Sequence, residues 1–389
     1  MKKKIAILGS TGSIGKTLLN IIEKDKKNIQ IVLLTAHKNY KTLIKQAKKF
    51  QVENLIITDN NCFNLIKKKY LNSKFKIFNS FECYNTIFKK KIDYTMSSIV
   101  GLNGLNPTIK IIKHTKNIAI ANKESIICAW NLIYKELLKN NTNFIPVDSE
   151  HFSIWYALNN KTNKNIDKIY LTASGGSLLK VPKKKYNSLK LEKILKHPNW
   201  KMGKKITIDS STLMNKVFEI IEAKKIFNLE YNKLEIIIHP HSYIHAIIKF
   251  KDGMIKLIAH DTTMEIPIFN SIYSNNYQNL KSQKIDFKRL NSLEFLKVDK
   301  KKFNLVKILK LLPKNNSLFE TVIVSANDEL VNQFLNKNIS YNDINRILIK
   351  ILNRNEFKKL KKNLPTKVLD VINTSNYVRY KIKSLYLKK

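Results

Sequence analysis

The segment that most constrains the fold is a short apolar run followed by a glycine turn at the start of the chain. Residues 4–8 (KIAIL) are typical of a buried strand, and glycines stand at positions 9, 12 and 15 before a helical pattern over residues 16–24. A strand, a glycine turn and a helix form the first unit of a dinucleotide-binding fold. The glycines let the backbone approach a pyrophosphate, and the helix N-terminus supplies free N–H groups. We therefore expect a nucleotide cofactor at this turn.

The end of the second apolar run, residues 29–35, bears on the choice of cofactor. His37, Lys38 and Asn39 follow shortly after it, so no acid stands where NAD enzymes use one for the ribose hydroxyls. Cations at this position favour a 2′-phosphate, so we expect NADP rather than NAD. The alternative is that Lys38 is merely one of many lysines in the chain.

Further apolar runs alternate with helical patterns at residues 54–58, 93–100 and 116–121. This alternation predicts an α/β fold with a doubly wound, mainly parallel sheet. Because ligands bind at the carboxyl ends of parallel strands, Asn122, Lys123 and Glu124 are candidate cofactor and substrate contacts. Asn122 could instead simply cap the helix that follows.

Two carboxylates, Asp148 and Glu150, stand two residues apart in the stretch PVDSEH (146–151). If the backbone is extended there, both side chains project to the same side. Convergent carboxylates either share a proton or hold a hard divalent cation such as Mg²⁺ or Mn²⁺. The alternative is a solvated turn.

Two later segments carry groups suited to a phosphate. A strand at residues 167–172 leads into a glycine and serine loop, ASGGS (173–177), whose N–H and hydroxyl groups could cup an anion. HPNWKMG (197–203) follows a polar stretch, and Trp200 in such a loop suggests a lid that closes on ligand. An ordinary packing role for Trp200 is the alternative.

DSST (209–212) is expected to cap a helix that runs to about residue 227. Ser210, Asn215 and Lys216 could hold a phosphate, and Glu219 could supply a third metal carboxylate. The alternative for Lys216 and Glu219 is an exposed i, i+3 ion pair.

The rest of the chain is interpreted as scaffold. Residues 234–239, 244–250 and 254–259 are expected to form antiparallel strands. His239, His241 and His245 allow a zinc site but are more typical of packing. Residues 273–301 are polar and poorly periodic, as in a linker, and residues 302–389 are dominated by helical periodicity.

The charge balance points to a different class of protein. The 389 residues include 71 Lys and Arg against 29 Asp and Glu, a net charge of +42, which is typical of nucleic-acid binders. The excess is nearly all lysine and is spread from end to end, which indicates compositional drift and argues against a nucleic-acid partner. Three cysteines without C-x-x-C spacing fit a reducing compartment. With no leader pattern and no apolar stretch long enough for a membrane, the cytoplasm is the expected location.

Taken together, the motifs resemble the 1-deoxy-D-xylulose 5-phosphate reductoisomerases, the NADPH enzymes of the non-mevalonate isoprenoid pathway. The resemblance covers most of residues 4–250 in order. It is carried by GSTGSIG (9–15), ANKES (121–125), PVDSEH (146–151), SGG (174–176), HPNWKMG (197–203), DSSTLMNK with Glu219 (209–219) and IHPHSYIH (238–245).

The resemblance implies a reaction: NADPH-dependent rearrangement and reduction of 1-deoxy-D-xylulose 5-phosphate to 2-C-methyl-D-erythritol 4-phosphate. It implies one divalent cation (Mg²⁺, Mn²⁺ or Co²⁺) held by Asp148, Glu150 and Glu219, with Lys123 also catalytic. The implied substrate contacts are Lys123, Ser149, Glu150, Ser174, His197, Trp200, Met202, Ser210, Asn215, Lys216, Glu219 and His245. The implied NADPH contacts are Thr11, Gly12, Ser13, Ile14, His37, Lys38, Asn39, Asn122, Glu124 and Gly203.

The family also implies a homodimer and an order of domains. We expect an NADPH-binding domain at residues 1–148 and an α+β catalytic domain at 149–272 with a lid loop at about 180–204. A linker at 273–301 and a helical domain at 302–389 follow. His37, Ala173, His241 and Glu265 depart from the family pattern, but none of them removes a proposed ligand.

A second enzyme class shares an N-terminal glycine turn, the aspartate-semialdehyde-type dehydrogenases. Such an enzyme needs a nucleophilic cysteine, and Cys128 is the candidate. Its neighbours (Ile126, Ile127, Ala129 and Trp130) indicate an apolar helix face, where a buried structural cysteine is commoner.

Overall fold

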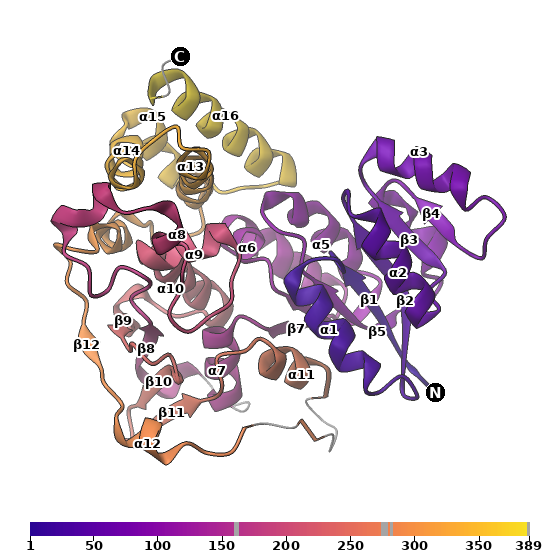
Figure 1. Cartoon of the computed structure of the whole chain (residues 1–389), viewed down its shortest axis with the longest axis horizontal. Coiled ribbons are helices and arrows are strands. Elements are labelled where there is room, and N and C mark those ends of the chain that lie inside the picture. The colour runs from indigo at the N-terminus through magenta and orange to yellow at the C-terminus, as the bar shows by residue number, and fades with distance from the viewer. Residues whose placement is uncertain (159–162, 274–278, 281–282, 387–389) are drawn as a thin grey trace. The chain divides into compact units, whose positions relative to one another are not determined.

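The computed structural model describes residues 1–158, 163–273, 279–280 and 283–386, and these fall into two compact units. The first unit comprises residues 1–125, 132–148 and 264–280. The second comprises residues 126–131, 149–263 and 281–389. Figure 1 follows the chain through both.

The first unit is built on a parallel sheet of seven strands in the order β4-β3-β2-β1-β5-β6-β7. All six neighbouring pairs run parallel. The strands are β1 (Lys3–Leu8), β2 (Ile29–Ala36), β3 (Asn54–Ile57), β4 (Lys76–Phe78), β5 (Ile92–Ser97), β6 (Thr115–Ile120) and β7 (Asn143–Pro146). The strand order reverses between β1 and β5, which is where a doubly wound sheet opens a crevice for a ligand.

Helices connect these strands as parallel pairing requires. They are α1 (Ser13–Glu23), α2 (Tyr40–Phe50), α3 (Asn60–Lys69), α4 (Tyr84–Ile87), α5 (Leu105–Ile112) and α6 (Lys123–Lys139), with the 3₁₀ turns Phe81–Cys83 and Leu102–Gly104. A further helix, α11 (Glu265–Tyr273), returns to this unit from much later in the chain. The buried Tyr94 hydroxyl lies 2.7 Å from Ser271 Oγ, and Tyr273 Oη donates to Asp25 Oδ2 at 2.7 Å.

The second unit contains a mixed sheet in the order β11-β10-β8-β9-β12. Its strands are β8 (Ile166–Ala173), β9 (Leu234–Ile238), β10 (Ile244–Phe250), β11 (Ile255–Ala259) and β12 (Leu296–Lys297). The hairpin of β10 and β11 is confirmed, and β9 is antiparallel to its neighbour β12 but not to its neighbour β8. Strand β9 runs parallel to β8, because the helical segments between those two strands provide the crossover that parallel pairing needs.

The helices around this sheet are α7 (Ser149–Leu158), α8 (Leu191–Ile194), α9 (Lys204–Ser211), α10 (Met214–Phe227) and α12 (Phe287–Asn291). Short 3₁₀ turns lie at Asn163–Asn165, Lys183–Ser188 and Tyr231–Lys233. The expected cap at residues 209–212 is wrong. Asp209, Ser210 and Ser211 close helix α9, and the left-handed Leu213 (φ +60°) separates it from α10.

The C-terminal part of the second unit is helical, as expected. It consists of α13 (Leu318–Leu335), α14 (Tyr341–Asn353), α15 (Asn355–Lys358) and α16 (Val368–Tyr386), with 3₁₀ segments Asn304–Leu311 and Lys359–Lys362. Helix α13 packs against α14 and α16 (Figure 1). Asn327 on α13 donates to Asp209 Oδ1 on α9 at 2.7 Å, and this hydrogen bond ties the two helices together.

The predicted fold class is therefore confirmed: a doubly wound α/β unit, an α+β sheet region and C-terminal helices. None of the helices in the described part of the chain combines the length and the apolar character needed to cross a membrane.

Candidate active site

The glycine turn after β1 has the shape that a pyrophosphate site requires. Gly9 has a left-handed φ of +82°, and a Cβ on Gly15 would lie 2.6 Å from the Ser10 Cα. Gly12 is the N-cap of α1 and has no side chain to cap it, while Gly12 and Ser13 are exposed. Thr11, Gly12, Ser13 and Ile14 thus form an accessible turn at the N-terminus of α1, which fits the phosphates of a dinucleotide.

At the end of β2, His37, Lys38 and Asn39 are all exposed. Lys38 Nζ lies 3.8 Å from Asp59 Oδ2, and His37 Nδ1 lies 2.9 Å from Thr58 Oγ1. Asn39 caps α2 by accepting from the Thr42 N–H. Two cationic or protonatable side chains thus follow β2, an arrangement that would suit the 2′-phosphate of NADP.

At the end of β6, the capping alternative for Asn122 is confirmed. Its Oδ1 accepts from the Ser125 N–H at 2.6 Å, and its Nδ2 donates to the Gly101 carbonyl at 2.6 Å. Lys123 begins α6, and its Nζ lies 2.6 Å from Asp148 Oδ2 within the same unit. Glu124 is buried. Lys123 and Asp148 are brought together here although they are 25 positions apart in the sequence.

The carboxylates follow a different geometry from the one predicted. Residues 148–150 are not an extended run, because helix α7 begins at Ser149 and Glu150 lies in its first turn. An acid in a first helical turn interacts favourably with the helix dipole. Ser149 Oγ donates to Glu150 Oε2 at 2.6 Å, which orients the carboxylate.

A buried lysine joins Glu150 to the third predicted carboxylate. Lys216 Nζ lies 2.5 Å from Glu150 Oε1 and also contacts Glu219 Oε2. Desolvation opposes the charge of Lys216, but Glu150 and Glu219 outweigh it, so its pKa is raised. The Lys216–Glu219 side chains are 5% and 1% exposed, so the alternative of an exposed ion pair is wrong. Asn215 Nδ2 donates to Glu219 Oε1 at 2.5 Å.

The donor set suits a hard divalent cation. Glu150 and Glu219 offer only oxygen, and one ammonium between two carboxylates leaves a net negative charge. Asp148 is two peptide units from Glu150, so the chain itself keeps their Cα atoms within about 7 Å. The residues therefore fit a carboxylate metal site.

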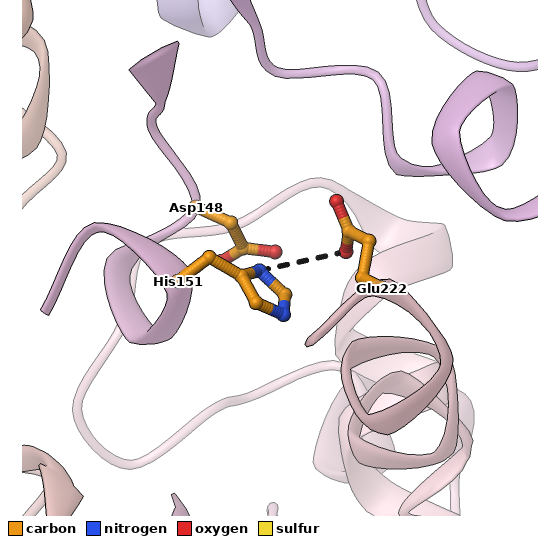
Figure 2. A group of neighbouring side chains, drawn as sticks. All are labelled: Asp148, His151 and Glu222. Carbon is orange, nitrogen blue, oxygen red and sulfur yellow. Dashed lines mark ion pairs between the residues drawn. The ribbon is translucent and has the colours of Figure 1, made fainter. Parts of the chain in front are cut away.

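His151 and Glu222 connect the two helices that carry these carboxylates (Figure 2). His151 is fully buried, its Nε2 lies 2.9 Å from the Glu219 carbonyl oxygen, and its Nδ1 lies 3.7 Å from Glu222 Oε2. Since a carbonyl only accepts, Nε2 carries a proton. Sequence reasoning assigned these two residues no role. The signal was the position of Glu222, one helical turn beyond Glu219.

Two of the predicted phosphate-binding residues, Ser174 and Ser210, lie beside His197, while Asn215 and Lys216 lie with the carboxylates. His197 Nε2 lies 2.9 Å from Ser174 Oγ and 3.2 Å from Ser210 Oγ, while His197 Nδ1 accepts from the Asn199 and Trp200 N–H groups. Desolvation lowers the pKa of His197 to about 4. The ring is therefore neutral near pH 7, with its proton on Nε2.

The glycine loop beside this serine pair is tightly packed. Gly175 and Gly176 have φ of +78° and +66°, and a Cβ on Gly176 would lie 2.6 Å from the Ser211 Cα. The Gly176 N–H also bonds to Ser174 Oγ at 3.0 Å. The loop and the end of α9 thus hold Ser174 and Ser210 around one imidazole.

Trp200, Met202 and Gly203 lead from His197 into helix α9. The Trp200 ring meets the His245 ring edge-on at 6.0 Å, and Gly203 is the helix N-cap. His245 is buried, stacks on His260 at 3.6 Å and donates from Nε2 to the His260 carbonyl. No group of three or more metal-capable side chains within the described residues includes His239, His241 or His245, which agrees with a packing role.

Cys128 does not have the surroundings of a nucleophile. It is 1% exposed, and burial raises its pKa above that of an ordinary thiol. A thiol held neutral in an apolar interior is unreactive. The aspartate-semialdehyde dehydrogenase alternative therefore has no support from the site.

The fold and these clusters fit a class of protein: an NADP-dependent oxidoreductase whose carboxylates suit a divalent cation and whose glycine and serine loop suits a phosphate. Family models of 1-deoxy-D-xylulose 5-phosphate reductoisomerase match residues 5–130, and models of its C-terminal domains match residues 144–227 and 261–381. The curated reductoisomerase of Pelagibacter ubique (strain HTCC1062) is 58% identical over 385 residues, covering 98% of this chain and 99% of that protein.

Solved structures give the same result. The 1-deoxy-D-xylulose 5-phosphate reductoisomerase of Zymomonas mobilis in complex with NADPH superposes with a TM-score of 0.88 at 29% identity, covering 99% of both chains. A reductoisomerase bound to NADPH, fosmidomycin and magnesium superposes with a TM-score of 0.88 at 28% identity, covering 98% of both. The chain belongs to the 1-deoxy-D-xylulose 5-phosphate reductoisomerase family. It is an NADP-dependent oxidoreductase.

Proposed function

We propose that this chain converts 1-deoxy-D-xylulose 5-phosphate to 2-C-methyl-D-erythritol 4-phosphate with the residues that surround Lys216. The observation that carries the assignment is the buried contact of one ammonium with Glu150 and Glu219. A divalent cation, when bound, would acidify a substrate hydroxyl and polarise the carbonyl, and NADPH would supply the hydride. Asp148, Glu150 and Glu219 would be its ligands.

The substrate would lie between this cluster and the serine pair. Ser174, Ser210, Asn215 and Lys216 would bind the phosphate and nearby hydroxyls, with the neutral His197 donating from Nε2. Lys123 and Ser149 would contact the carbon backbone. Trp200 and Met202 would close over the ligand, with His245 behind Trp200. Binding a phosphate far from the reacting carbons contributes orientation energy to the chemical step.

NADPH would lie on the first unit. Its pyrophosphate would bind at Thr11, Gly12, Ser13 and Ile14, and its 2′-phosphate at His37, Lys38 and Asn39. Asn122, Glu124 and Gly203 would contact the nicotinamide half. Asn122 acts there chiefly by fixing the loop at Gly101, since its own amide is already hydrogen-bonded.

The test is NADPH oxidation with 1-deoxy-D-xylulose 5-phosphate, with added Mg²⁺ or Mn²⁺ and with EDTA. We expect metal-dependent oxidation that falls at least 100-fold in Glu150→Gln, a loss of roughly the size seen when a group that stabilises charge in a transition state is removed. The matched control is Glu230→Gln, an exposed acid in the same unit, which should keep full activity. If folded protein binds NADPH but oxidises none with this ketose, the substrate assignment fails.

We also propose a homodimer formed through the sheet of the second unit. β11 is an edge strand, and Met254, Ile255 and Leu257 on or beside it are 63%, 53% and 46% exposed. An edge strand with exposed apolar side chains pairs readily with another chain. Light scattering should give twice the mass of one chain for the wild type and for Leu138→Lys, an exposed control on α6, but one chain for Leu257→Lys.

For the cell, we propose a cytoplasmic location. The predicted cofactors are cytoplasmic metabolites, and the cysteines of the described chain are unpaired. Fractionation of the native host, with the protein recovered among membrane or exported proteins, would contradict it.

A further inference from the structure

The adenosine end of the proposed NADPH site contains an acid that the cofactor assignment does not use. Asp59 follows β3, and its backbone N–H donates to the His37 carbonyl at 3.3 Å. Strands β2 and β3 are paired in register up to Ala36 and Ile57. The residues that follow the two strands therefore lie next to each other. Asp59 therefore belongs to the wall of the same subsite as Lys38.

This wall fixes the segment that carries the cations. His37 Nδ1 contacts Thr58 Oγ1 at 2.9 Å, and Cys62 Sγ lies 3.5 Å from the Lys38 carbonyl oxygen as a donor. With the Asp59 N–H bond, three contacts from residues 58–62 hold His37 and Lys38. The backbone of the cationic segment is thus set by the segment that carries the acid.

The carboxylate of Asp59 is itself oriented. Its Oδ1 accepts from the Cys62 N–H at 3.0 Å as the N-cap of α3, while its Oδ2 lies 3.8 Å from Lys38 Nζ. The hydrogen bonds from Cys62, and then the charges of Lys38 and His37, lower the pKa of Asp59, so the group is ionised near pH 7. The side chain of Lys38 is 71% exposed, whereas that of Asp59 is only 18% exposed. The lysine is the exposed partner, and the acid is the more enclosed partner, held by its hydrogen bond from Cys62.

We propose that Asp59 is a specificity-determining residue that limits the preference of this protein for NADPH over NADH. Its carboxylate holds Lys38 when no cofactor is bound, and a 2′-phosphate must draw the lysine away and then lie near a like charge. NADH has no 2′-phosphate, so its binding neither draws Lys38 away from Asp59 nor places a second negative charge beside Asp59. The inference rests on the proposed placement of the 2′-phosphate at His37 and Lys38.

Asp59→Asn separates the charge of this residue from its structural role. Asparagine caps a helix N-terminus as well as aspartate, so the variant keeps the α3 cap and the loop. The dissociation constants of NADPH and NADH are measured by cofactor fluorescence without substrate or metal. We expect NADPH to bind roughly three- to tenfold more tightly, the size of one partly screened charge pair, and NADH to change less than about twofold.

Three further variants make the result decisive. Glu53→Gln removes an exposed acid at the opposite end of the same strand and should leave both constants unchanged, which excludes an effect of net charge alone. Asp59→Ser, which also caps, should repeat the Asn result. Lys38→Gln should weaken the binding of NADPH and leave the binding of NADH unchanged.

The outcomes test the role of Asp59 separately from the proposed placement of the 2′-phosphate at His37 and Lys38. If Lys38→Gln weakens NADPH while Asp59→Asn changes nothing, the role of Asp59 is refuted and the 2′-phosphate site stands. If Asp59→Asn changes the dissociation constants of NADPH and NADH equally, the role of Asp59 is structural and the inference fails. If Lys38→Gln affects both cofactors equally, the 2′-phosphate does not bind there, and the site assignment falls together with the inference.

Discussion

Lys216 on α10 lies against Glu150 on α7, with 2.5 Å between its Nζ and Glu150 Oε1, although the two residues are 66 positions apart. The lysine is 5% exposed and reaches Glu219 as well, so it neutralises part of a buried acidic cluster. Removing one partner from a buried ion-pair cluster strongly destabilises the folded protein, because it leaves a buried charge without its counter-charge.

We expect Lys216→Gln to lower the free energy of unfolding by about 3 kcal/mol, because two buried carboxylates lose their counter-charge. Millimolar Mg²⁺ should restore more of this loss than it adds to the wild type, since a cation then balances Glu150 and Glu219. Urea unfolding with and without Mg²⁺ measures both effects.

The matched control is Lys225→Gln, nine residues further along α10, whose buried partner is Glu320 on α13. It should be destabilised too, but Mg²⁺ should not rescue it. Equal rescue of both variants would mean that the cation does not act at the Glu150 and Glu219 cluster.

Gly176→Ala should destabilise the protein by roughly 2 kcal/mol or more and weaken phosphate binding. The new Cβ would meet the Ser211 backbone, and φ of +66° adds strain of about 1 kcal/mol. Gly253→Ala is the control, since φ there is +87° but no atom lies within 4 Å of the new Cβ. Thermal unfolding of the two variants separates the clash from the strain, and equal losses would show that the packing against α9 is loose.

His197 makes the stability of the protein depend on pH in a predictable direction. Its pKa is lowered to about 4 in the folded protein, so between about pH 6.5 and 4 the unfolded chain binds a proton that the folded protein does not. The contribution of the neutral ring is complete above about pH 6.5 and is lost as the pH falls through this window.

We therefore expect the loss of stability between pH 7 and 5 to be smaller in His197→Asn than in the wild type. His239, His245 and His260 also have lowered pKa values because of burial and remain in both proteins, so the difference isolates His197. Parallel pH profiles of urea unfolding would contradict a neutral His197.

Thiol labelling of the native protein should modify Cys62 and Cys83, which are partly exposed, and leave Cys128 unmodified until the chain unfolds. Cys128→Ala should retain catalysis, because a buried neutral thiol supplies no nucleophile. Mass spectrometry of the labelled protein locates the adducts. Rapid alkylation of Cys128 with parallel loss of activity would revive the dehydrogenase alternative.

Several elements followed directly from local sequence. The strand, glycine turn and helix at the N-terminus were predicted correctly, because Gly9 and Gly15 occupy positions where the backbone geometry excludes a side chain. Five strands of the parallel sheet (β1, β2, β3, β5 and β6) were found to within a few residues from their apolar runs, whereas the short strands β4 and β7 were not predicted. The metal, phosphate and NADPH assignments came from the motifs and the resemblance, and they remain predictions at the level of single residues.

Other features were mispredicted where two local signals compete. Asp209, Ser210 and Ser211 are good caps by composition, yet they lie at the C-terminal end of α9, because Leu213 turns the chain between two helices. Residues 148–150 suit an extended strand end, but Ser149 begins a helix. Two short elements, α12 (Phe287–Asn291) and β12 (Leu296–Lys297), were not predicted because the segment that contains them has little periodicity, and β12 pairs with β9.

The sequence by itself determined the fold class, through its alternating strands and helices, and the geometry of the N-terminal glycine turn. It predicted the chemistry: phosphates at that turn and oxygen ligands for a hard cation. Only the tertiary structure decided which side chains share their charges and protons. Lys216 lies against Glu150 rather than in solvent, His197 is neutral because burial desolvates its ring, and Asp59, in the loop after β3, lies beside Lys38. These relationships depend on burial and on contacts between distant parts of the chain, and both arise only when the elements pack together.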